Sequence, residues 1–307
     1  MSVDAGPGAV GALRRQYGRI LAEASARASA RRRLVAAAMA GLATLAILLA
    51  LFPLVDIVLL VLVRGAGGLN FSIFSEVTSG IAGGLQNAIL GTIALTGLGL
   101  VIAAPLGIAT GVFMAEWTSA RLAAVLGYLC DVLVGVPSIV VGYFGFVLFV
   151  GDFGWGFSWL AGAISLSVIM MPYIARTTQL TLAKVPGHLR EGSLALVVTR
   201  ARTTQSVMLP AALPGILTGI LLAMGIGLGE TAPLLYTASW SNYNPTLALT
   251  HSPVGYLTYV VWTFIQEPFS SAHRLAYVAA LLLMASVLAI NLVARQLLAH
   301  RQARAGA

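Results

Sequence analysis

Charged side chains are scarce in this chain, which has 18 Lys and Arg and 10 Asp and Glu among 307 residues. Ordinary soluble domains carry roughly a quarter charged residues. So few charges cannot cover the surface of a water-soluble fold whose mean hydropathy is +0.92. Intrinsic disorder is excluded as well, because disordered segments are poor in apolar residues and 59% of this chain is hydrophobic. The composition therefore predicts a polytopic membrane protein.

Several chemical signatures are also missing. The single cysteine, Cys130, excludes a disulfide framework and a multi-cysteine metal site. The four histidines are scattered along the chain and lack the spacing of zinc ligands. The chain has no Gly-Lys-Ser/Thr P-loop, so any ATP must be handled by a partner. We therefore expect no catalytic residue, no metal site and no cofactor bound by this chain.

Long apolar runs replace the polar–apolar alternation of a barrel strand, which favours spanning helices. A spanning helix needs about 20 mostly apolar residues. Six runs meet this requirement: 34–63, which includes Asp56; 88–115; 122–150, which includes Asp131; 153–175; 203–229; and 275–294. A seventh stretch, 252–266, is short and aromatic, and we expect an interfacial or re-entrant helix there. Glycine-rich positions such as Gly135-Val136-Pro137 are interpreted as sites of close helix packing.

Basic residues lie almost entirely on one side of these spans. Of the 18 Lys and Arg, only Arg64 and Arg274 fall on the other side. We expect the chain to lie in the plasma (inner) membrane. The positive-inside rule then places both termini, the basic segment 1–33 and the tail 296–307, in the cytoplasm. Segment 1–33 does not fit a signal peptide. Contact with anionic membrane lipid explains its arginines better than nucleic-acid binding, and its residues 11–30 have amphipathic helical spacing.

Three acidic residues interrupt the apolar runs. Asp56 is expected at the outer membrane boundary, while Asp131 is either a structural partner for another helix or a functional group. Glu230 stands in the segment Gly229–Leu235, where Pro233 removes a backbone donor and weakens the helix. A carboxylate at a broken helix is typical of a transport pathway. The alternative is a helix that merely ends there.

The longest charged interior stretch, residues 183–208, predicts a short amphipathic helix outside the bilayer that begins near Pro186-Gly187. The residues Glu191-Gly192-Ser193, followed by Met208-Leu209-Pro210, resemble the EAA loop of ABC-importer permeases. The segments Met171–Thr178, Thr218–Leu222 and Gly229–Leu235 resemble the phosphate-uptake permeases of PstA type. The resemblance is ungapped from about 171 to 236 and looser from 85 to 295.

This resemblance implies an all-α, type I ABC-importer permease with six transmembrane helices: a first helix at 34–63 and a core of five at 85–295, with a cytoplasmic coupling helix in loop 183–208. It implies an ATP-driven importer of inorganic phosphate, in which this chain works with a second homologous permease chain, an ATPase dimer that holds ATP and Mg, and an external phosphate-binding protein. The implied coupling residues are Glu191, Gly192, Ser193 and Leu194, and the implied pathway residues are Arg176, Glu230, Thr231 and Pro233.

Three positions depart from the family pattern. Gly192 and Ser193 replace two alanines, Val197 replaces a glycine, and Ile226 replaces an arginine four residues before Glu230. We expect Val197 to keep a negative φ, because a β-branched residue at positive φ is an outlier. Without an arginine at 226, Arg176 and basic groups of the partner permease would have to carry the anion. The alternative for Arg176 is that it extends to the cytoplasmic headgroups.

Two other functions stay open. One is an ABC permease for another oxyanion, such as phosphonate, sulfate or molybdate. The other is a secondary transporter that needs no ATPase, for which internal repeats would be expected; the sequence shows no convincing repeat.

Overall fold

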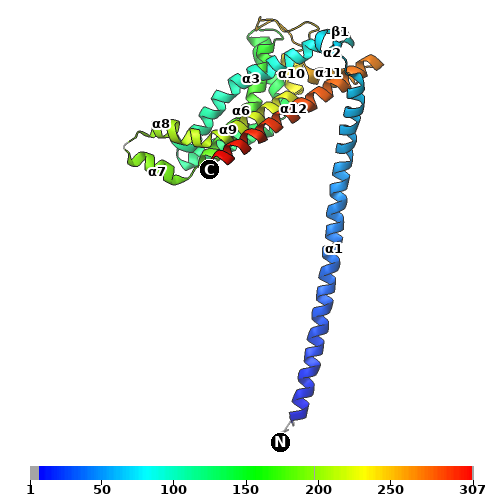
Figure 1. Cartoon of the computed structure of the whole chain (residues 1–307), viewed down its shortest axis with the longest axis vertical. Helices are drawn as coiled ribbons and strands as arrows, with labels where there is room; N and C mark the ends of the chain where they lie inside the picture. Colours follow the sequence, from blue (N-terminus) through cyan, green and yellow to red (C-terminus); the bar gives the residue numbers. More distant parts are fainter. Residues whose placement is uncertain (1–6, 197, 306–307) are drawn as a thin grey trace. The chain divides into compact units, whose positions relative to one another are not determined.

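The computed structural model describes residues 7–196 and 198–305, and it divides into two units that meet between Leu60 and Val61. The first unit is the greater part of helix α1 (Pro7–Gly68), which runs without a break from the basic segment through the first predicted span and past Pro53. Its described apolar side chains are almost all exposed, as expected for a helix that faces lipid or a partner chain. Figure 1 shows this helix at the blue end of the chain.

The second unit is a helical bundle with one small hairpin. Its elements in chain order are the end of α1, α2 (Ser72–Ser75), β1 (Thr78–Ser79), β2 (Ala82–Gly83), α3 (Gln86–Val112), η1 (Phe113–Trp117), α4 (Ala120–Gly135), α5 (Ser138–Gly145), η2 (Phe146–Asp152), α6 (Trp159–Ala183), α7 (Gly187–Ala195), α8 (Arg200–Thr203), η3 (Thr204–Met208), α9 (Leu209–Gly229), α10 (Ala232–Thr237), α11 (Leu257–Phe264) and α12 (Ser270–Ala305). The two strands pair antiparallel, and η1, η2 and η3 are π-helical turns.

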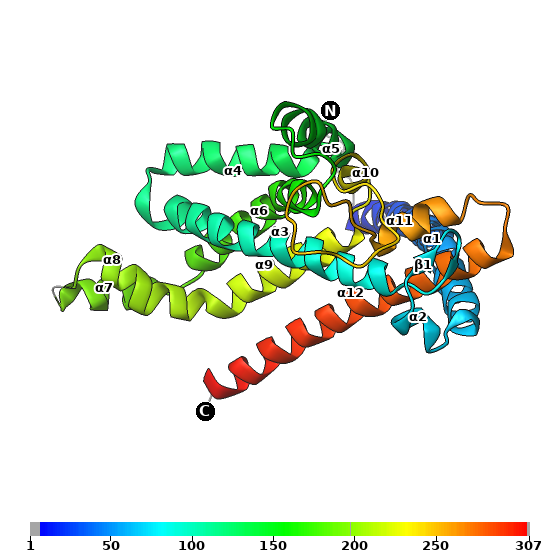
Figure 2. The ribbon, with the colours of Figure 1, turned by 90° about the horizontal axis from the view of Figure 1, so that it is seen from above.

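Small residues bring α3, α6 and α9 together in the centre of the bundle (Figure 2). A Cβ at Gly107 would lie 2.8 Å from Cβ of Ile174, so α3 and α6 approach too closely for any larger residue there. On the other side of α6, a Cβ at Gly219 would lie 2.7 Å from Cβ of Thr177. This is the packing expected in a membrane, where close backbone approach replaces the hydrophobic effect between helices.

Within the described residues, five helices are long and apolar enough to cross a membrane, and a bent pair makes a sixth span possible. The five are Arg32–Gly68, Gln86–Trp117, Trp159–Ala183, Arg200–Gly229 and Ser270–Gln296. These agree with five of the six predicted runs in place and type. The fourth run begins later than expected, because Gly154 and Gly156 adopt positive φ and Ser158 caps the helix that follows.

The run 122–150 remains a candidate span, but it is bent and does not form one straight helix. The segment forms α4 and α5, which meet at 90°. Pro137 lacks a backbone donor and disfavours a helical conformation at Val136, which is extended at φ −68°, ψ 128°. The Gly135-Val136-Pro137 motif is therefore a helix break. Its interpretation as a site of close helix packing is wrong, because a Cβ at Gly135 would meet nothing within 4 Å.

The short stretch 252–266 contains α11, which is eight residues long and packs against α12 and α3. Its buried face includes Leu257, Val260 and Phe264, which join a core cluster with Leu275 of α12. This helix is too short to span a membrane, as the sequence predicted, and it is built into the bundle.

Candidate transport site and coupling surface

The chain leaves the helical conformation at Glu230. Helix α9 ends at Gly229, Glu230 is extended at φ −71°, ψ 132°, and α10 begins two residues later with Pro233 in its first turn. The backbone oxygen of Glu230 accepts a hydrogen bond of 2.8 Å from the Thr258 hydroxyl. This bond satisfies a carbonyl that the break removes from the helical ladder, which is how irregular backbone is tolerated inside a membrane bundle.

The second helix break lies against this one. The side chain of Ser138, the first residue of α5, interacts with the Glu230 carboxylate. One turn further along α5, a Cβ at Gly142 would lie 2.4 Å from Cα of Pro233. The two breaks, at Val136-Pro137 and at Glu230-Thr231, are thus packed together. Sequence analysis singled out Glu230 and missed Ser138 and Gly142.

Thr231 and Pro233 have local roles in this arrangement. The Thr231 backbone oxygen accepts hydrogen bonds from the amides of Leu234 and Leu235, at 3.1 and 3.2 Å, which starts α10. Pro233 is buried, and Thr231 is half-buried. These residues shape the break beside Glu230.

Arg176 lies in α6 and pairs with Asp131 of α4. The distance from Nη2 to Oδ2 is 3.3 Å, and Nη1 donates a 2.7 Å hydrogen bond to Gln179. The side chains of Arg176 and Asp131 are 36% and 54% exposed, so the pair opens onto the surface of this chain. Asp131 is therefore the partner of another helix, which was one of its two predicted roles.

The structure does not bring Arg176 and Glu230 together. The neighbour of Arg176, Thr177, packs beside Gly219 of α9. At 1.5 Å per residue, Gly219 lies about 16 Å along α9 from Glu230. The predicted pathway residues consequently form two separate places, one at the crossing of the breaks and one nearer the loop end of α6.

The predicted coupling residues all lie on α7 and are accessible. Glu191 and Gly192 are exposed, Leu194 is 45% exposed, and Ser193 exchanges a 3.0 Å hydrogen bond with Thr203 of α8. No side chain of α7 is buried among the residues that the structure describes. Val197 lies outside the described residues, so the prediction of a negative φ at this position stays a prediction.

A buried acid that sequence analysis missed holds the loop to the bundle. Glu116, in η1 at the end of α3, forms an ion pair with Arg190 of α7, and its backbone oxygen accepts a hydrogen bond from Arg200 of α8. The Arg200 guanidinium also lies over the Trp117 ring, 5.5 Å from its centroid. The available signal was an acid directly after an apolar run, opposite two loop arginines that were interpreted only as topology determinants.

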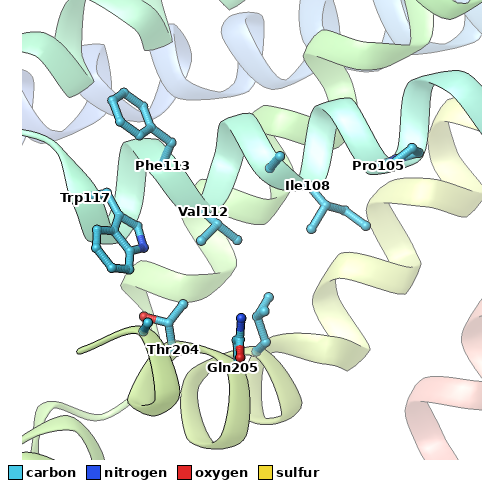
Figure 3. A pocket seen from close by; sticks show the side chains of 10 residues that line it. Pro105, Ile108, Val112, Phe113, Trp117, Thr204 and Gln205 are labelled. Atoms are coloured by element: carbon cyan, nitrogen blue, oxygen red, sulfur yellow. The ribbon is translucent and has the colours of Figure 1, made fainter. Parts of the chain in front are cut away.

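An apolar groove of about 470 Å³ runs beside this attachment (Figure 3). Ile108 and Val112 of α3 face Gln205 of η3 across it, and Trp117 and Thr204 stand at one end. The loop end of α3 and the turn η3 are thus separated along part of their length.

A family model described as "binding-protein-dependent transport system inner membrane component" matches residues 107–304 of the chain. The chain belongs to this family. It is a permease subunit of a transport system in the inner membrane, and not itself an enzyme.

Relatives of this permease cover most of it. It is 43% identical to the phosphate transport system permease protein PstA 2 of Mycobacterium bovis over 226 residues, which are 74% of this chain and 75% of that relative. It is 37% identical to the phosphate transport system permease protein PstA of Xylella fastidiosa over 271 residues, 87% of this chain and 94% of that relative. An inward-facing structure of the MetNI methionine ABC transporter shares the fold at 18% identity, with a TM-score of 0.60 over 70% of this chain and 95% of the other.

Proposed function

We propose that this permease is the membrane-spanning subunit of an ATP-driven importer of inorganic phosphate. The names of its relatives, phosphate transport system permease proteins with 33–43% identity, support the substrate. The structural observation that carries the proposal is α7, a helix at one end of the bundle with no described side chain buried and with Glu191 and Leu194 accessible. Such a helix suits a docking element for an ATPase, because the chain has no nucleotide-binding loop of its own.

The surface of α4 and α5 supports a second permease chain as partner. These helices expose large side chains, including Tyr128 and Phe144, which are 68% and 63% exposed. The half-exposed ion pair of Arg176 and Asp131 lies at the same surface, because Asp131 belongs to α4. A homologous chain over this surface would enclose the pair and complete a pathway between the two subunits.

The proposed assembly also contains an ATPase dimer, which holds ATP and Mg, and an external phosphate-binding protein. Closure of the ATPase dimer would push on α7 and switch the pathway from inward-facing to outward-facing. The coupling residues would be Glu191, Gly192, Ser193 and Leu194.

Arg176 would handle the anion. A phosphate in a low-dielectric path needs positive charge, and the planar guanidinium can bind two phosphate oxygens at once. In this structure Asp131 occupies the guanidinium, so phosphate would compete with the carboxylate for it. The negative charge of the Glu230 carboxylate would repel an anion. We therefore propose that Glu230 gates the pathway and pairs with a cation of the partner chain. Thr231 and Pro233 would hold the break open beside it.

The proposed orientation has both termini in the cytoplasm. Arg64 and Arg274, the two cations assigned to the outer side, are neighbours in the structure: Gly68 of the last turn of α1 packs against the Arg274 side chain, and Arg64 donates to Tyr277 of α12. The basic segment 1–33 would contact anionic lipid on the inner leaflet.

The test is reconstitution of the permease with its partner chain, ATPase and binding protein in proteoliposomes. Uptake of radiolabelled phosphate should require ATP and the binding protein, and excess unlabelled phosphate should compete for it. Stronger competition by sulfate, molybdate or a phosphonate would assign the importer to that anion. Uptake driven by an ion gradient without the ATPase would make the chain a secondary transporter.

A further inference from the structure

Helix α7 is attached to the bundle by few contacts. It packs on α8 and η3, and none of its described side chains is buried. Two of its described polar side chains hold it: Ser193 bonds Thr203, and Arg190 pairs with Glu116. The second of these contacts reaches from the loop to a spanning helix other than α9.

Glu116 is placed for this role. Its side chain is 4% exposed, whereas that of Arg190 is 42% exposed, so the acid belongs to the bundle and the base to the loop. A buried carboxylate requires a partner, because an unpaired buried charge is costly. The backbone oxygen of Glu116 accepts a hydrogen bond from the Arg200 guanidinium, so both short helices of the loop, α7 and α8, converge on this residue.

We propose that Glu116 is a positioning residue for energy coupling, which transmits movement of α7 to α3 through Arg190. The inference rests on the proposed function, in which an ATPase moves α7. It assigns to η1 a role that the EAA-like residues on α7 cannot fulfil, since those residues face away from the bundle or toward α8.

The packing beyond Glu116 supports transmission. Helix α3 continues from η1 along α6, and Gly107 and Gly111 of α3 leave no free space against Ile174 and Thr178. Helix α6 is packed as closely on α9, which ends at Gly229, directly before Glu230. A displacement of η1 therefore cannot be absorbed at these helix contacts, because closely packed interiors transmit strain.

The groove beside η1 makes the polar link more important. Ile108 and Val112 of α3 line one side of the apolar groove of about 470 Å³, and Gln205 of η3 lines the other (Figure 3). At the end of this space, Arg200 spans from α8 to Trp117 and Glu116. Without these contacts the loop could move against α3 and close or open the groove while α3 stayed in place.

The test compares four variants in the assembled, reconstituted complex: Glu116→Gln, Arg190→Gln, Arg190→Lys and, as a matched control, Arg202→Gln. Arg202 is an exposed arginine of α8 for which the described residues include no ion-pair partner. The measured quantity is the number of ATP molecules hydrolysed per phosphate imported. It should rise roughly fivefold or more in Glu116→Gln and Arg190→Gln, within the range of typical coupling free energies, and stay at the wild-type value in Arg190→Lys and Arg202→Gln.

The double variant Glu116→Gln/Arg190→Gln separates a specific pair from general damage. If the two residues act through one contact, the double variant should be no worse than either single variant. A residue that only stabilises the fold would lower uptake and ATP hydrolysis together and leave their ratio unchanged. A wild-type ratio in Glu116→Gln, or fully additive effects, would overturn the inference.

Hydrogen exchange gives a readout that does not depend on the substrate. In the assembled complex, amides of residues 187–195 should exchange faster in Glu116→Gln than in wild type, and Arg202→Gln should not change them. If wild type imports no phosphate while the exchange result holds, the proposed substrate is wrong and the attachment stands. If phosphate is imported and exchange in α7 is unchanged in Glu116→Gln, the attachment is wrong.

Discussion

Glu230, which follows the last residue of α9, interacts through its carboxylate with the side chain of Ser138, the first residue of α5. Each residue stands at a proline-associated break in a helix, and the breaks pack against each other through Gly142 and Pro233. Broken helices that cross at membrane depth supply free backbone groups and a point of low stiffness. We therefore expect a change of access to rearrange the helices at this crossing.

The contact between the breaks is tested by Gly142→Ala. The new Cβ would lie 2.4 Å from a backbone atom of Pro233, so α5 or α10 must shift. We expect the free energy of unfolding to fall by about 1–3 kcal/mol, and phosphate uptake to fall with it, measured by thermal denaturation in detergent and by vesicle uptake. Gly225→Ala is the control, because its Cβ meets nothing within 4 Å. A Gly142→Ala protein with wild-type stability and uptake would show that the close contact is dispensable.

Arg176 is expected to need its guanidinium and not only its charge. Arg176→Lys should lower uptake by the reconstituted complex, because a lysine cannot bind two oxygens in a planar fork. Arg176→Gln should lower it further. The matched control is Arg121→Gln, an exposed arginine at the start of α4. Wild-type uptake by a well-expressed Arg176→Gln protein would remove Arg176 from the pathway.

Reversal of the charge of Glu191 should uncouple ATP hydrolysis from uptake. The residue is exposed on α7, so Glu191→Lys should insert and fold normally while it disturbs ATPase docking. Uptake should fall roughly tenfold or more, corresponding to about 1.4 kcal/mol of coupling, as measured with ATPase activity in proteoliposomes. Glu76→Lys, at an exposed acid in another loop, should have no effect. Normal uptake in Glu191→Lys would reduce the loop to a topology determinant.

Single-cysteine labelling tests the orientation. In a Cys130→Ala background, a cysteine at Gly192 should react with an impermeant maleimide only from the cytoplasmic side, and one at Asp152 only from outside. Both positions are exposed, and a Cβ at Gly192 meets nothing within 4 Å. The buried Cys130 is removed so that it cannot contribute a background signal. The opposite labelling pattern would contradict the positive-inside assignment and the docking role of α7 together.

Sequence analysis predicted the helical class and the places of five spans, because long apolar runs have one physical explanation. It missed the bend between α4 and α5, since the run 122–150 is apolar on both sides of Pro137 and hydropathy does not detect a change of direction. It predicted the break at Glu230 because a charge, three glycines and a proline coincide there. The equivalent break at Pro137 has no charge of its own. Ser138 is recognised as the partner of Glu230 only when the two helices are packed together.

The coupling loop shows the same limit. The exposure of Glu191 followed from an amphipathic pattern outside the bilayer. The partner of Arg190 did not, because Glu116 is far away along the chain and long-range ion pairs leave no periodic signal. Asp131 and Arg176 were each singled out by their charge, but only the fold shows that they pair.

The absence of buried side chains in α7 has a consequence for how this subunit can diversify. Because the bundle core does not depend on that helix, its outward residues can change together with the surface of an ATPase at little cost in folding. The departure at Gly192 lies in this exposed part, whereas Ser193 bonds the buried Thr203 of α8. Arg190 is also constrained, since its partner is buried in the bundle. A loop transplanted from another permease should therefore redirect the choice of ATPase, provided that an arginine remains opposite Glu116.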